Sequence, residues 1–166
     1  MQKTDRRLCG NQGLTLIELV VVVLIMGIVA ATAFVGISQT TRMDADGTAG
    51  KIQSSLELTR MQTIAAANDA EVKLKLAKDS NGYYASLLQK SGASFIELDR
   101  IDIGPARMTV QVKNGAATST VDATGVIFTY RKSDGSFTSA YDTIVVSGVK
   151  TKNIVLVKAT GRCYIE

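Results

Sequence analysis

One apolar run dominates the N-terminal part of the chain. Residues 19–37 carry no charge, and Glu18 is the only charged residue between Arg7 and Arg42. As a helix, residues 14–37 would be about 36 Å long, which is enough to cross a hydrocarbon core about 30 Å thick. We therefore predict that residues 14–37 form the membrane-spanning first half of a long N-terminal helix.

The helix is expected to continue beyond the apolar run. Residues 38–68 contain no proline, and Leu58, Met61 and Ala65 recur at i, i+3 and i+7, with Ile64 beside them. This spacing indicates that the second half of the helix presents an apolar side. We predict an extramembrane half over residues 38–68.

The remaining residues, 69–166, follow a different pattern, with apolar and polar residues alternating in short stretches. Val72, Leu74 and Leu76 alternate with lysines, and this period of two is typical of half-buried strands. Asn-Gly and Asp-Gly pairs between such stretches are turn signals. The pattern predicts about eight strands, over residues 72–76, 83–89, 94–101, 108–112, 126–131, 142–147, 153–159 and 162–165. The expected fold is α+β, with a long N-terminal helix packed on a small antiparallel globular β domain.

Charge sets the orientation of the apolar run and weakens the case for nucleic acid. The chain has a net charge of +4, but Lys3, Arg6 and Arg7 against Asp5 give the first thirteen residues +2, so the remainder carries only +2. Cations before the apolar run favour a cytoplasmic N-terminus and a translocated C-terminal domain. The protein is thus expected to be a single-pass cytoplasmic (inner) membrane protein with a periplasmic or extracellular domain.

Several kinds of chemistry are absent from the sequence. The chain has no histidine, which excludes imidazole bases and histidine metal sites. Cys9 and Cys163 lie on opposite sides of the apolar run, so no internal disulfide remains if the leader is removed. Aspartates at positions 99, 102, 122, 134 and 142 have no calcium-loop spacing, and we interpret them as solvated turn residues. We expect no catalytic residue, no metal and no cofactor, and therefore no enzyme.

Residues 13–19, Gly-Leu-Thr-Leu-Ile-Glu-Leu, resemble the cleavage and methylation motif of type IV prepilins and type II secretion pseudoprepilins. The resemblance implies that residues 1–13 are a leader, that a prepilin peptidase cuts between Gly13 and Leu14, and that Leu14 is then N-methylated. Leu14 stands where the family usually has phenylalanine. The implied partners are other pilin or pseudopilin subunits, the prepilin peptidase, a membrane assembly platform and the lipid bilayer.

The presence of a carboxylate, Glu18, at the start of the apolar helix can be explained physically in such a subunit. An intramembrane carboxylate costs roughly 2.5–3.5 kcal/mol at the bilayer centre. Cleavage would create an α-amino group near the head of the same helix. A carboxylate can pair with the N-terminus of an incoming subunit where water is excluded, and burying both charges is tolerable whereas burying one is not. Glu18 is therefore our candidate assembly residue. The alternative is that it sits at the headgroup level without a role.

A narrower resemblance covers two further stretches. Residues 53–65, running into residues 72–74, and residues 154–162 are similar to the helix-to-strand junction and the C-terminal hairpin of the H-type minor pseudopilins and FimT-type minor pilins. This resemblance implies a minor subunit of a type IV pilus or of a type II secretion pseudopilus. A major pilin or another minor pilin remains open.

Two alternative functions are considered. Lys150, Lys152, Lys158 and Arg162 could contact DNA phosphates, as in the minor pilins of DNA uptake. Solvated lysines that protect a sheet edge are the simpler interpretation, and we expect no nucleic-acid partner. The second alternative is a secreted β protein whose signal peptide is cut after residues 31–33, Ala-Thr-Ala, leaving Phe34 at the N-terminus.

Overall fold

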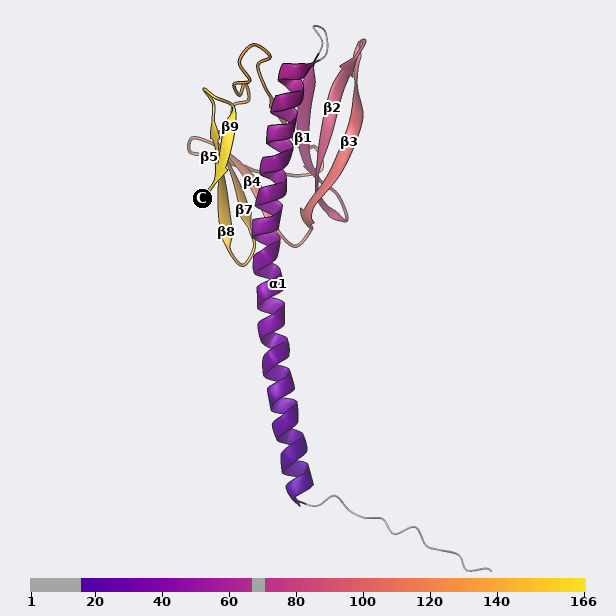
Figure 1. The fold of residues 1–166 in the computed structure, drawn as a ribbon, viewed down its shortest axis with the longest axis vertical. Coiled ribbons are helices and arrows are strands. Elements are labelled where there is room, and N and C mark those ends of the chain that lie inside the picture. The colour runs from indigo at the N-terminus through magenta and orange to yellow at the C-terminus, as the bar shows by residue number, and fades with distance from the viewer. Residues whose placement is uncertain (1–15, 67–70) are drawn as a thin grey trace, which may run out of the picture. The chain divides into compact units, whose positions relative to one another are not determined.

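The computed structural model describes residues 16–66 and 71–166, without the side chains of residues 29–43. One helix, α1 (Leu16–Ala65), precedes all the strands. The chain divides into two compact units, residues up to Ile37 and Ser38–Glu166, which we describe separately. α1 contributes its first part to the first unit and its second part to the second unit, where it packs with the strands (Figure 1).

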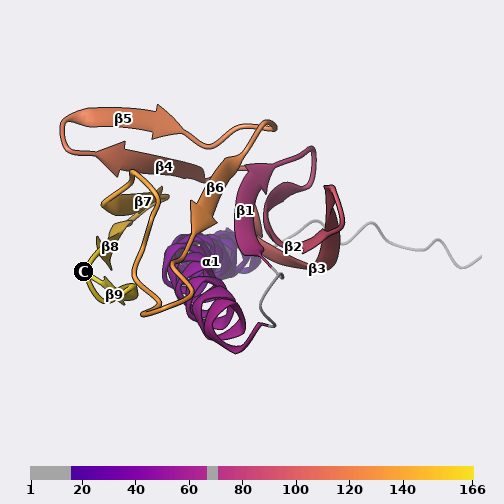
Figure 2. The ribbon, with the colours of Figure 1, turned by 90° about the horizontal axis from the view of Figure 1, so that it is seen from above.

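The strands of the second unit form two antiparallel sheets on either side of α1 (Figures 1 and 2). The described residues contain nine strands: β1 (Val72–Lys78), β2 (Gly82–Ser91), β3 (Ser94–Pro105), β4 (Thr109–Asn114), β5 (Ala117–Thr120), β6 (Val126–Thr129), β7 (Thr143–Ser147), β8 (Thr151–Val157) and β9 (Arg162–Ile165). The first sheet has the order β3-β2-β1-β6 and the second β5-β4-β7-β8-β9. The α+β class and the antiparallel pairing that the sequence predicts are confirmed.

The strand count differs from the prediction of about eight because β5 was not expected. All four residues of β5 are exposed, so the strand has no buried positions to produce an alternating pattern. It pairs with β4 across the predicted turn at Asn114 and Gly115. β3 also runs further than predicted, to Pro105, whereas β9 has the predicted bounds.

The hydrophobic core lies between the second part of α1 and both sheets. The helix contributes Ala45, Ala49, Ile52 and Leu56, all at most 1% exposed. The strands contribute large side chains from both sheets, including Leu76, Tyr83, Val110, Val112, Phe128, Ile144, Val146 and Ile154. The side of α1 that packs on the strands is therefore not the predicted apolar side. Leu58, Met61 and Ile64 are 36%, 58% and 45% exposed.

Polar residues occupy the buried side of α1 because their hydroxyls are satisfied within the helix. Ser55, Thr59 and Thr63 are at most 5% exposed. Thr59 donates to the carbonyl of Ser55 at 2.7 Å, and Thr63 donates to the carbonyl of Thr59 at 2.8 Å. A buried hydroxyl that bonds to the residue four positions earlier avoids the cost of an unpaired polar group. These small side chains allow the strands to approach the helix.

Polar contacts hold the second part of α1 to both sheets. Asp44 pairs with Arg107, which follows β3, and Asp46 pairs with Lys152 on β8 at 3.6 Å. Further along, Gln53 Nε2 donates to the carbonyl of Cys163 on β9 at 3.1 Å. The contacts reach loops and strands on both sides, so this part of the helix is fixed within the second unit.

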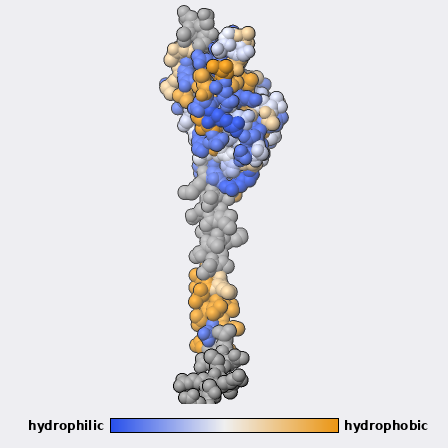
Figure 3. Space-filling model, turned by 90° about the vertical axis from the view of Figure 1, so that its right-hand side faces the viewer, coloured by the Kyte–Doolittle hydropathy of each residue, from blue (hydrophilic) through white to orange (hydrophobic). Residues whose placement is uncertain are grey.

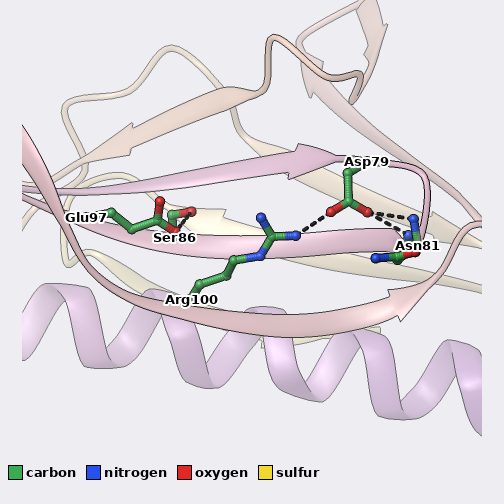
Figure 4. Close-up of polar contacts among 6 residues, drawn as sticks. Asp79, Asn81, Ser86, Glu97 and Arg100 are labelled. Atoms are coloured by element: carbon green, nitrogen blue, oxygen red, sulfur yellow. Dashed lines mark hydrogen bonds and ion pairs between the residues drawn. The ribbon is translucent and has the colours of Figure 1, made fainter.

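The outer face of the first sheet carries a satisfied polar network (Figure 4). Ser86 donates to Glu97 at 2.8 Å, and Arg100 pairs with Asp79. Asp79 also accepts the main-chain N–H of Asn81 at 2.8 Å, and this bond, with Arg100, lowers the pKa of Asp79. These groups close the predicted turn between β1 and β2 and stabilise the β2–β3 pairing.

Candidate functional site

The first segment of α1 exposes a continuous apolar surface. Every described side chain in residues 16–28 is exposed, and the large apolar ones range from 43% at Val22 to 82% at Leu16. Figure 3 shows hydrophobic side chains covering this segment. A helix that is apolar on all sides is stable only when lipid or other protein covers it. Such a surface is typical of a helix that lipid or other protein covers.

Glu18 lies within this apolar surface. It occupies the first turn of α1, where the unsatisfied N–H groups and the helix dipole favour a negative charge. Its neighbours Ile17 and Leu19 are 72% and 57% exposed. Gly13 and Leu14, the predicted cleavage and methylation residues, lie outside the described residues.

In the part of the chain that the structure describes, no helix is long and apolar enough to cross a membrane. The membrane-spanning half over residues 14–37 and the boundaries of the predicted domains therefore stay predictions.

The four cations considered as DNA contacts do not form one cluster. Lys152 lies at the start of β8 and pairs with Asp46 at 3.6 Å, and Lys150 precedes it in the β7–β8 turn. Lys158 follows β8, and its Nζ donates to the carbonyl of Ala140 at 2.7 Å. Because a strand rises about 3.3 Å per residue, Lys152 and Lys158 lie about 20 Å apart.

Arg162 lies at the other end of the second sheet from Lys150. It begins β9 and pairs with Val157 at the end of β8. Together with Arg60, near the end of α1, it lines a cavity of about 280 Å³. The structure thus brings Arg162 close to a helix residue rather than to Lys150 and Lys152.

Three of the five aspartates, Asp122, Asp134 and Asp142, hold turns as the sequence predicts, whereas Asp99 and Asp102 lie within β3 and not in turns. Asp122 accepts the N–H of Thr124 at 2.9 Å. Asp142 accepts the N–H of Gly115 at 2.7 Å. Asp134 bonds to Ser136, and these bonds lower its pKa. Within the described ranges no cluster of three or more acidic, cysteine or histidine side chains could hold a metal ion.

Cys163 is a free thiol that faces the helix. It is 5% exposed, and its Sγ lies 3.9 Å from the carbonyl oxygen of Gln53. Burial raises the pKa of this thiol to about 12, so it stays protonated and unreactive at neutral pH. Cys9 lies outside the described residues.

A comparison with protein families decides how the N-terminal segment is interpreted. Residues 9–34 match the prokaryotic N-terminal methylation motif. This is a type IV pilin-like prepilin signal, and it indicates a membrane-anchored, pilin-like or pseudopilin subunit. No curated protein and no solved structure matches the chain.

The methylation motif contains all three residues that the sequence singles out at the N-terminus, namely Gly13, Leu14 and Glu18. Arg60 is the residue whose surroundings sequence reasoning missed. The sequence places Arg60 in the predicted helix but gives no sign of its contacts. These contacts come from two loops that are distant in sequence. The sequence gives a turn signal at Gly135, in the Asp134-Gly135 pair, but connects neither Gly135 nor Gly161 to the helix.

Proposed function

We propose that this chain is a minor pilin or pseudopilin that assembles through its N-terminal helix into a type IV pilus or a type II secretion pseudopilus. The peptidase removes residues 1–13 by cutting after Gly13, and Leu14 becomes the methylated N-terminus. The first half of the helix anchors the subunit in the cytoplasmic membrane before assembly. The C-terminal domain lies in the periplasm or outside the cell, and the protein has no catalytic activity and no cofactor.

The single observation that carries this proposal is the methylation motif at residues 9–34. The exposure of residues 16–28 supports it, because an apolar helix surface of this extent requires burial against lipid or neighbouring helices. Lipid would cover it before assembly, and the helices of other subunits would cover it in the filament.

The second part of α1 supports the same mode of assembly. Its apolar residues Leu58, Met61 and Ile64 point away from the core and remain exposed, so they are available to neighbouring subunits. The opposite side is fixed to both sheets through the contacts of Asp44, Asp46 and Gln53.

In this proposal Glu18 sets the register of assembly. Its carboxylate pairs with the methylated α-amino group of an adjacent subunit, inside a bundle from which water is excluded. A subunit in the wrong register would bury one of the two charges alone, which costs several kcal/mol. The pair therefore discriminates between registers in an otherwise featureless apolar bundle.

Neither alternative function gains support. A DNA-uptake subunit would be expected to gather its cations, but Lys152 is engaged by Asp46 and lies about 20 Å along β8 from Lys158. A secreted β protein with a cleaved signal peptide does not explain a methylation motif at residues 9–34.

The test is substitution of Glu18 followed by two separate measurements. Glu18→Ala and the isosteric Glu18→Gln should enter the membrane fraction as well as the wild type, because an intramembrane charge is removed. Both should fail to co-purify with the other pilin subunits. Glu71→Ala is the matched control, since Glu71 is an exposed glutamate that pairs with Lys73 at 3.0 Å. Normal incorporation of Glu18→Gln would contradict the proposed role.

A further inference from the structure

A small charged cavity lies where the end of α1 meets the C-terminal hairpin. Its volume is about 280 Å³, which suits one side chain rather than a polymer. The residues that line it are Glu57, Arg60, Met61, Gly161, Arg162 and Cys163. Two arginines and one glutamate at one opening leave a single positive charge in excess.

The backbone fixes the position of the Arg60 guanidinium. Its Nε donates to the carbonyl of Gly135 at 3.1 Å. Gly135 and Gly161 both have positive φ, of 67° and 66°. A Cβ would lie 2.9 Å from Arg60 Nε at Gly135 and 3.1 Å from it at Gly161. Two loops therefore make room for this side chain with residues that have no Cβ.

The two arginines of the cavity form no ion pair with a described residue. Among the residues that the structure describes, neither Arg60 nor Arg162 has a carboxylate within ion-pair distance, whereas the nearby Arg131 pairs with Asp134 at 3.5 Å. Glu57 accepts a bond from Gln53 at 3.4 Å and pairs with no cation there. Within residues 16–66 and 71–166, Arg60 donates only through its Nε, so its terminal nitrogens are available there as donors.

We propose that this cavity binds the carboxylate of an aspartate or glutamate side chain on a neighbouring protein subunit. Guanidinium groups bind carboxylates through paired, charge-assisted hydrogen bonds. One carboxylate would balance the single excess charge of the lining, whereas a phosphate dianion would exceed it. Met61 lines the cavity and Ile64 follows it three residues later in α1, and their side chains are 58% and 45% exposed. The acidic side chain of the partner would therefore have apolar residues around it.

Binding at the cavity does not depend on the proposed function, whereas the identity of the partner as a filament subunit does. The probe is therefore sodium propionate, which carries the carboxylate of a glutamate side chain and no other polar group. It is titrated into the full-length protein in detergent, with the arginines labelled with ¹⁵N, and sodium chloride at equal ionic strength is the reference. We expect saturable shifts of the Nε–H signals of Arg60 and Arg162. The signal of Arg131, already paired with Asp134, should not respond.

Two variants test the assignment. Arg162→Gln should weaken propionate binding, read at Arg60, by about tenfold, which corresponds to one lost charged hydrogen bond. Arg131→Gln should leave it unchanged. Arg162→Gln should also reduce co-purification with pilin subunits while cleavage after Gly13 proceeds normally. Absence of cleavage in the wild type would instead count against the proposed function and not against the cavity.

Two results would overturn the proposal. If chloride shifts the Arg60 and Arg162 signals as much as propionate, the cavity has no carboxylate site. If inorganic phosphate or a short single-stranded DNA binds tighter than propionate by about tenfold or more, the cavity recognises phosphate, and the DNA-uptake alternative would move ahead of the assembly function.

Discussion

The hydroxyl of Tyr130 donates a hydrogen bond to the main-chain carbonyl of Leu56 across 2.8 Å, inside the core. Tyr130 lies just after β6, and its ring packs against Phe137 with centroids 4.4 Å apart. The bond therefore joins the middle of the packed part of α1 to the segment that leads from the first sheet to the second. It is one of the contacts that make the helix and both sheets a single unit.

Loss of this bond should have a measurable cost. Tyr130→Phe keeps the ring but removes one hydrogen-bond partner of the Leu56 carbonyl. We expect the free energy of unfolding to fall by about 1 kcal/mol. The measurement is urea denaturation of the full-length protein in detergent. Tyr164→Phe is the control, because Tyr164 is 46% exposed and should change stability little. Equal effects of the two substitutions would show that the Leu56 bond contributes nothing.

Gly161 and Gly115 offer a matched pair for the loop contact around Arg60. Both have positive φ, of 66° and 59°, so alanine should cost about 1–2 kcal/mol of backbone strain at either position. A Cβ at Gly161 would also clash with the carbonyl oxygen of Gly135, whereas nothing lies within 4 Å of a Cβ at Gly115. Gly161→Ala should therefore destabilise the protein clearly more than Gly115→Ala in the same denaturation assay. Similar losses would mean that the two loops separate freely.

Stability should fall in alkaline solution because of Cys163. Burial raises the pKa of its thiol from 9.0 to about 12, so the folded protein holds this proton where the unfolded chain releases it. The stabilisation is complete below about pH 9 and is lost as the pH rises toward about 12, with a slope of up to about 1.4 kcal/mol per pH unit. Burial also raises the pKa of Tyr130, which adds to the loss above about pH 10.

Denaturation midpoints measured across this alkaline range test the linkage. Cys163→Ala should lower stability at neutral pH, since it removes a buried group, but should flatten the alkaline slope. Tyr130→Phe in the same background should flatten it further. An unchanged slope in the double variant would show that other groups control the alkaline transition.

The strands were predictable wherever one face of the sheet is buried. Leu74 and Leu76 are buried between half-exposed lysines, and Val110 and Val112 follow the same pattern on β4. β5 was not predictable, because its small residues are all exposed and its pairing comes from the turn at Gly115. Tertiary context, rather than an alternating pattern, places that strand.

Only part of the buried side of α1 could be found from hydropathy. Ala45, Ala49, Ile52 and Leu56 are apolar and buried, but Ser55, Thr59 and Thr63 share the buried side because their hydroxyls bond within the helix. Leu58 and Met61, which are apolar, stay exposed. Near the end of α1 the apolar residues therefore do not mark the side that faces the strands.

One part of the candidate site could also be predicted from the sequence and the other part could not. The N-terminal motif was predictable because all its residues are contiguous, and residues 9–34 match the methylation motif. The Arg60 cavity was not, since it depends on Gly135 and Gly161 converging on one helix residue. Local patterns identify the N-terminal motif, whereas the surface that the domain presents requires the fold.

Processing at the N-terminus is the most direct test of the whole account. Mass spectrometry of the protein purified from its native membrane should give N-methylated Leu14 as the first residue, because Gly13 offers the small residue before the cut and the basic leader stays inside. Gly13→Val should retain the leader and remain in the membrane. A mature N-terminus at Met1 or at Phe34 would contradict the account, since the first means no processing and the second means cleavage of an ordinary signal peptide.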